Sequence, residues 1–103
     1  MSARSDALRQ MLAQDPKNSF VRYGLALDLL NSGDGEGAVT EFRTLIENDP
    51  NYVAAYFHGG RALETLGRTE DAKAIYRDGI ATARRTGDGH TLGELEGALA
   101  MLG

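Results

Sequence analysis

The chain contains only two prolines, Pro16 and Pro50, and they lie 34 residues apart. Each follows an aspartate, and the sequence after the first proline is matched at the same interval by the sequence after the second. The matched pairs are Tyr23 with Phe57, Leu29 with Leu63, Gly33 with Gly67, Glu36 with Glu70, Ala38 with Ala72, Phe42 with Tyr76, Arg43 with Arg77, and Ile46 with Ile80. Internal similarity at a fixed period of roughly 20 to 50 residues is typical of stacked structural repeats.

The repeated unit resembles the tetratricopeptide repeat (TPR), a helical hairpin of about 34 residues with small and aromatic residues at fixed places. The residues that carry the resemblance are Arg22, Leu25, Ala26, Leu29, Ala38, Phe42 and Pro50 in the first copy and Tyr56, Gly59, Gly60, Leu63, Ala72, Tyr76 and Arg84 in the second. Arg22, Gly59 and Arg84 depart from the usual bulky apolar residue, leucine and proline. The resemblance covers residues 17–86 and implies an all-α fold. We expect a right-handed α-solenoid of antiparallel helical hairpins with a C-terminal capping helix.

Apolar periodicity and turn residues divide the single expected domain, residues 1–103, into four parts. The stripe of Leu8, Met11 and Leu12 stops before Asp15 and Pro16, so residues 1–15 are interpreted as half a repeat whose first helix is missing. Repeat one covers 16–49, repeat two covers 50–86, and a capping helix covers 91–102. The expected helices span 3–14, 19–32, 36–48, 52–66, 70–86 and 91–102.

Polar residues at the helix starts and small residues within the helices lead to further expectations. Ser19, Asn51 and Thr69 are expected to cap three helices, and Thr91 with Glu94 reads as a capping box. The residues expected at close helix crossings are Ala38, Gly59, Gly60, Ala72 and Gly79. Those expected in the core are Leu25, Leu63 and Ile80. The helix over 19–32 is apolar on nearly every side, which indicates either a sandwiched helix or a face that awaits a partner; the sandwich is favoured.

Charge and composition argue against several classes of partner. The net charge is −4 and the pI is near 5.0, whereas nucleic-acid-binding domains usually carry a basic stripe, so no nucleic acid is expected. The amino-terminal residues lack the apolar core of a secretory signal, and no run is long enough to span a membrane. Without cysteine, disulfides are excluded. We expect a cytoplasmic protein that does not bind membranes.

The sequence offers no recognisable catalytic or metal-binding motif. His58 and His90 have no second ligand at the i+4 spacing that zinc sites on a helix use. The glycines of residues 33–37 are followed by no Gly-Lys-Ser/Thr, and no Gly-x-Ser-x-Gly elbow accompanies His58. We therefore expect no enzyme, no cofactor and no metal.

The resemblance implies that the first helices of successive repeats line a concave face that binds peptides or partner helices. By alignment, the partner-binding groove comprises Phe20, Tyr23, Leu27, Leu30, Phe57, His58, Arg61 and Glu64. The last helix would complete it with His90, Gly93, Glu94 and Gly97. The predicted function is protein or peptide binding in this groove. The alternative is homo-oligomerisation, or assembly, through the same apolar face, with a homodimer as its simplest form.

The alignment also leads to a sharper hypothesis about the groove. Tyr23, Leu27 and Phe57 would form its floor and take a bulky apolar side chain of the partner. Arg61 would pair with a carboxylate beside that side chain.

Overall fold

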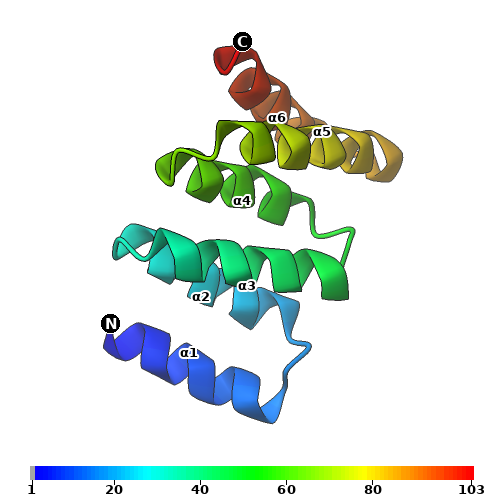
Figure 1. The fold of residues 1–103 in the computed structure, drawn as a ribbon. Helices are drawn as coiled ribbons and strands as arrows, with labels where there is room; N and C mark the ends of the chain where they lie inside the picture. The colour runs from blue at the N-terminus through cyan, green and yellow to red at the C-terminus, as the bar shows by residue number, and fades with distance from the viewer. Residues whose placement is uncertain (1) are drawn as a thin grey trace.

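The computed structural model describes residues 2–103, and in this range the chain forms six α-helices and no strand. The helices are α1 (Ala3–Gln14), α2 (Ser19–Asn31), α3 (Gly35–Asn48), α4 (Val53–Thr65), α5 (Thr69–Thr86) and α6 (Gly89–Met101). Figure 1 shows them stacked from α1 at one end of the molecule to α6 at the other. Each helix packs against the next, and α4 also contacts both α2 and α6. The predicted all-α solenoid of helical hairpins is confirmed.

The helices fall into two kinds. We call α2, α4 and α6 the first helices and α1, α3 and α5 the second helices of the repeats. All three first helices are 13 residues long. Contacts of α4 with α2 and with α6 place the first helices side by side, as the resemblance implied.

Glycine ends three of the helices. Gly33, Gly67 and Gly87 follow α2, α4 and α5 with φ of 91°, 76° and 78°. Glycine adopts this left-handed conformation at little cost because it has no Cβ, and it turns the chain back while satisfying the last carbonyls of the helix. These glycines close the two hairpins and begin the turn to α6.

The expected caps of α2 and α6 are wrong by a few residues. The side chain of Asn18, not of Ser19, accepts from the first turn of α2, while the Ser19 hydroxyl donates to Asp49. Helix α6 begins two residues earlier than expected, and the Asp88 carboxylate accepts from the amide and the hydroxyl of Thr91. An acceptor just before the first turn lies closest to the unpaired amides, so it takes the capping role from its neighbour.

The expected caps of α4 and α5 are also wrong. These helices start after Tyr52 and Arg68, and neither side chain makes a capping hydrogen bond. The amide oxygen of Asn51 instead accepts from Arg85 at 2.9 Å, which ties the start of α4 to the end of α5. Thr69 lies inside α5 as its first residue.

The hydrophobic core runs along the seams between the helices. Leu25 and Leu63 are buried as predicted, with 1% and 0% of their surface exposed. Ile80 is only half-buried, which corrects its assignment to the core. It lies on α5 near the end of the stack, where only α6 follows. Ala38 and Ala72 are fully buried, as expected of small residues at close crossings.

The three glycines expected at close helix crossings lie where neighbouring side chains leave little room. A Cβ on Gly60 would lie 2.1 Å from Cε1 of Tyr76, and one on Gly79 would lie 2.6 Å from Cβ of Tyr56. A Cβ on Gly59 would lie 3.1 Å from Cδ1 of Ile75. The prediction that helices press together at these positions is confirmed.

Helix α2 is sandwiched, as favoured from the sequence. It contacts α1, α3 and α4. Its fully buried residues are Val21, Leu25, Ala26 and Leu29. Phe20 is the exception, with 77% of its surface exposed. The departure at Arg22 is explained by polar contacts, because its guanidinium pairs with Glu41 of α3 and donates to the carbonyl of Pro16.

Helix α1 is held on α2 by apolar and polar contacts together. Leu12 is buried, and Leu8 packs against the core near Gly24. The Asp28 carboxylate accepts from the hydroxyls of Ser2 and Ser5, and Ser5 has no exposed surface. These hydrogen bonds hold the pKa of Asp28 below its usual range.

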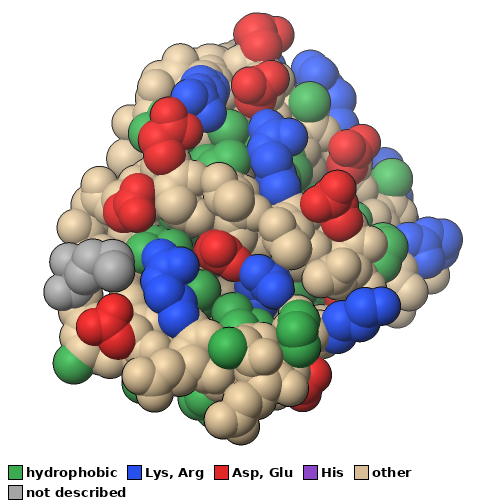
Figure 2. Space-filling model, turned by 60° about the horizontal axis from the view of Figure 1, so that its bottom comes forward, with side chains coloured by type: hydrophobic (Ala, Val, Ile, Leu, Met, Phe, Trp, Pro, Cys, Tyr) green, Lys and Arg blue, Asp and Glu red, His purple; other side chains and the backbone are tan. Residues whose placement is uncertain are grey.

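Charged side chains of both signs intermingle on the surface. Figure 2 shows one face on which Lys and Arg alternate with Asp and Glu, with hydrophobic side chains between them. Interspersed charges of both signs are typical of solvated helix faces. Within residues 2–103, no helix is both long enough and apolar enough to cross a membrane.

Candidate functional site

A hollow lies between α4 and α6, two of the first helices, near one end of the stack. The α4–α6 hollow has a volume of about 400 Å³. It is lined by Phe57, Arg61 and Glu64 from α4 and by Glu94, Gly97, Ala98 and Met101 from α6. Three of the eight predicted groove residues therefore line one hollow.

Arg61 offers a positive charge at the mouth of this hollow. Its guanidinium carbon lies 5.8 Å from the centre of the Phe57 ring, within the range of a cation–π contact. None of the ion pairs within residues 2–103 includes Arg61, and its side chain is exposed. The guanidinium is thus positioned by an aromatic face and keeps its donors available.

Glu64, also on α4, is held at the hollow by a residue of a second helix, α5. The Tyr76 hydroxyl of α5 donates a hydrogen bond to the Glu64 carboxylate. Its ring can cross α4 because Gly60 has no side chain. Burial, reinforced by the Glu64 carboxylate, raises the pKa of Tyr76, so its hydroxyl remains a donor. Sequence analysis matched Tyr76 with Phe42, and the hydroxyl that distinguishes the two was the available signal.

Aromatic rings form a cluster next to the hollow. The His58 ring centre lies 5.0 Å from that of Phe57 and 5.7 Å from that of Tyr23. Tyr52 packs against Tyr23 with ring centres 5.2 Å apart, and Phe42 stacks with His58 at 6.5 Å. Edge-to-face and offset pairs of this kind stabilise by about 0.5–1.5 kcal/mol each beyond their buried area. The cluster is therefore well-packed structure that supports Phe57 from behind.

The predicted groove residues separate into four groups. Phe57, Arg61 and Glu64 line the hollow, and Tyr23 and His58 belong to the aromatic cluster beside it. Leu27 and Leu30 pack half-buried against the core, and Phe20 lies exposed on α2. Sequence analysis did not name Met101, although 86% of its surface is exposed at the hollow.

Comparison with known proteins agrees with this architecture. A family model described as tetratricopeptide repeat matches residues 23–87, more than half of the chain. The chain belongs to the tetratricopeptide repeat family. Domains of this family are in general protein–protein interaction modules and typically have no catalytic role.

Relatives and solved structures resemble this TPR chain over most of its length. A TPR repeat-containing protein of Pseudomonas aeruginosa is 34% identical over 83 residues, which cover 81% of this chain and 79% of that protein. The crystal structure of a tetratricopeptide repeat domain protein from Salinibacter ruber is 39% identical with a TM-score of 0.78, over 82% of this chain and 94% of that one. A solution structure from Bordetella parapertussis has a TM-score of 0.84 at 28% identity, over 99% and 89% of the two chains.

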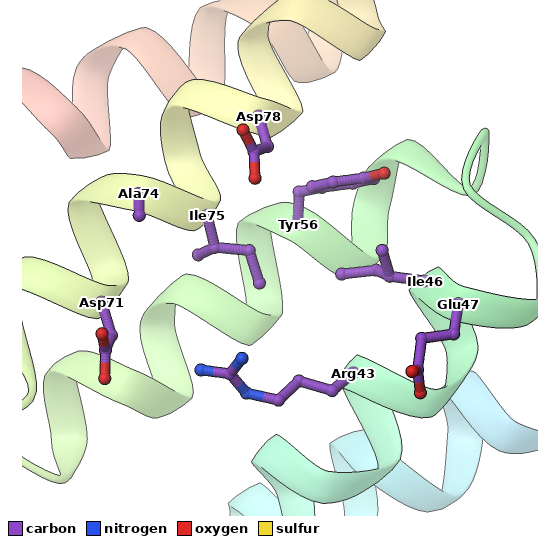
Figure 3. Close-up of a pocket in the computed structure, with 8 residues that line it drawn as sticks. All are labelled: Arg43, Ile46, Glu47, Tyr56, Asp71, Ala74, Ile75 and Asp78. Carbon is purple, nitrogen blue, oxygen red and sulfur yellow. The ribbon is translucent and has the colours of Figure 1, made fainter.

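A second hollow lies on the opposite layer of the TPR stack, between α3 and α5. It has a volume of about 390 Å³. Figure 3 shows its lining: Arg43, Ile46 and Glu47 of α3, Tyr56 of α4, and Asp71, Ala74, Ile75 and Asp78 of α5. Within residues 2–103, no cluster of three or more histidine, aspartate or glutamate side chains has the arrangement to hold a metal ion.

The surroundings of His58 predict a pH-dependent step in the stability of the domain. Burial among the aromatic rings lowers the pKa of His58 below its ordinary value of 6.5, although Glu94 on α6 opposes this shift. The unfolded chain therefore binds a proton at His58 before the folded chain does. We expect the free energy of unfolding to fall as the pH drops below about 6.5, and His58→Gln to remove most of this fall in thermal melts.

The matched control for this experiment is His90→Gln, because the side chain of His90 is 87% exposed. Asp28 and Asp88 do not titrate in the pH range of this experiment, because hydrogen bonds lower their pKa values from 3.8. An unchanged pH dependence in His58→Gln would mean that the aromatic cluster opens to water.

Proposed function

We propose that the chain is a non-catalytic protein-interaction module that binds a peptide or protein segment on the face formed by α2, α4 and α6. The observation that supports this most directly is the α4–α6 hollow, where Arg61 lies over Phe57 without an ion-pair partner in the described residues. A charged donor above an aromatic ring, beside a highly exposed methionine, is typical of surfaces that anchor a partner.

The chemistry of the hollow suggests what the partner presents. Phe57, Ala98 and Met101 form apolar walls, and a Cβ built on Gly97 would meet nothing within 4 Å. This space suits one bulky apolar side chain. Arg61 suits a carboxylate next to that side chain, while the carboxylates of Glu64 and Glu94 disfavour a second acidic group. Binding should depend only mildly on salt, because one ion pair contributes and the rest is apolar contact.

The test selects peptides from a phage-displayed random library against the immobilised protein. We expect enrichment of an aromatic or large aliphatic residue adjacent to aspartate or glutamate. Gly97→Leu should abolish binding of these peptides because its side chain fills the hollow. Arg61→Glu should abolish the preference for the acidic residue.

The matched control is Gly89→Leu, which adds the same side chain about two turns earlier on α6, also into open space and outside the predicted groove. It should bind the selected peptides like the parent. Peptides that bind Gly97→Leu and the parent equally would contradict this location of the site. If the chain binds itself through the same face, Gly97→Leu would instead lower its apparent mass in solution.

A further inference from the structure

The first helices can be compared residue by residue because they have equal length. Aligning Ser19–Asn31, Val53–Thr65 and Gly89–Met101 from their first residues places Ala26, Gly60 and Glu96 at the same position. Ala26 and Gly60 are buried, whereas Glu96 is exposed. Helix α6 therefore presents to solvent the side that α2 and α4 bury against their own second helices.

The second helices can be compared in the same way. Helices α1 and α3 end 34 residues apart, and each is followed by an aspartate cap and a proline. This register places Arg4, Ala38 and Ala72 at the same position. Ala38 and Ala72 have no exposed surface, whereas Arg4 is exposed. In the two complete repeats this position holds a small, buried alanine. In α1 it holds an arginine whose side chain is exposed to solvent.

The end of the stack carries a groove equivalent to the hollow in Figure 3. In that hollow, Arg43 and Ile46 of α3 face the next second helix, α5. One repeat later, Arg77 and Ile80 line a groove of about 500 Å³ between α5 and α6, which we call the end groove. No helix within residues 2–103 covers it. The other residues that line it are Ala81, Arg84, Glu96, Leu99 and Ala100.

The end groove has the shape and chemistry to receive a second helix of a repeat. Leu63 is fully buried, while Leu99, at the same position of α6, is only half-buried. Helix α1 is a second helix, and within residues 2–103 it has no first helix of its own. Within residues 2–103, the two ends of the helix stack thus present the two halves of one repeat.

The charges at the two ends are complementary. Gly60 of α4 and Ala72 of α5 are both buried in the packed pair of helices of repeat two. Joining α6 of one copy to α1 of another would place Glu96 and Arg4 at these two positions, on helices that face each other. Asp6, which takes the position of Ala74, would approach Arg77. Glu96 already accepts from Arg84 at 3.0 Å, but both side chains are about half-exposed or more, and an exposed pair of this kind holds them weakly.

From this geometry we propose that the protein associates head to tail with a second copy of itself, α1 of one copy docking in the end groove of the next. The contact completes a composite repeat from α6 and α1. Because the two surfaces differ, the association does not close at a dimer, and further copies can add. This surface is separate from the α4–α6 hollow of the proposed function.

Sedimentation velocity across a micromolar to millimolar concentration series tests the proposal. We expect the mean mass of the parent to rise with concentration beyond that of a dimer, and high salt to reduce this rise. Arg4→Glu or Glu96→Arg alone should lower the association constant at least severalfold. The double variant should restore it, as should mixing the two single variants.

Matched controls separate the contact from a general charge effect. Arg9→Glu and Glu47→Arg make the same charge changes at exposed positions and should associate like the parent. Arg9 matches Arg43 in the 34-residue register, so it faces α3 of its own chain and not the α6 of a second copy. Arg4→Ala keeps helix propensity high and should weaken association without adding repulsion near Asp28. A parent that stays monomeric at millimolar concentration would overturn the proposal. So would a double variant that is folded by circular dichroism yet does not regain association.

Discussion

Replacing Gly60 with alanine is expected to lower the free energy of unfolding by about 1–3 kcal/mol, the usual cost of overpacking a core. The added Cβ would lie 2.1 Å, 2.5 Å and 2.6 Å from Cε1, Cζ and Cδ1 of Tyr76. The ring has little freedom to withdraw, because Tyr76 is fully buried and its hydroxyl donates to Glu64. Chemical denaturation followed by circular dichroism measures the loss.

Gly93→Ala is the matched control for this substitution. Gly93 also lies within a helix, but a Cβ there would meet nothing within 4 Å. Alanine should therefore stabilise the domain at this position by about 0.5–1 kcal/mol, since glycine is costly in a helix interior. The two substitutions have opposite expected signs although the chemical change is identical. Equal stability of Gly60→Ala and the parent would show that Tyr76 does not cross α4 at this point.

The arrangement of helices was largely predictable from the 34-residue period. Every helix begins and ends within two residues of its expected bounds. The glycine turns and the apolar stripes set the helix bounds through local interactions. Stacking of the repeats then buries the same positions in each copy. Ala38 and Ala72 are therefore both buried, and so are Leu29 and Leu63, as the alignment of the two copies implies.

The helix caps were less predictable, because adjacent polar residues compete for the same unpaired amides. Asn18 precedes Ser19, and Asp88 precedes Thr91, so the sequence offers two acceptors at each helix start. Which one caps depends on where the first helical residue falls. That choice reflects the turn before the helix as much as the cap residue itself.

The sequence predicted which face of the stack carries the groove, but not how deep the groove is along that face. Alignment placed Tyr23 and Phe57 on one side of the stack, yet only Phe57 lines the α4–α6 hollow. Tyr52, which precedes α4, packs against Tyr23 and makes it part of a cluster. Periodicity within helices carries no information about a side chain from a turn, so the depth of the groove near Tyr23 needed the structure.

Replacing Leu63 with alanine is expected to lower the free energy of unfolding by about 2–5 kcal/mol, because it removes a fully buried side chain and leaves a cavity. Ile80→Ala should cost clearly less in dilute solution, since Ile80 is half-buried at the end groove. Denaturant titrations of both variants measure the difference. Similar losses in dilute solution would mean that Ile80 belongs to the core after all.

The same pair of variants distinguishes core packing from packing between copies. Leu63 contributes within one chain, so the cost of Leu63→Ala should not depend on protein concentration. Ile80 faces the end groove, where α1 of a second copy would add buried contact. Association stabilises the folded state by mass action, so the cost of Ile80→Ala should grow as the concentration rises. If the loss in free energy of unfolding caused by Ile80→Ala stayed constant up to millimolar protein concentration, the end groove would be exposed to solvent. That result would contradict docking of α1 in this groove.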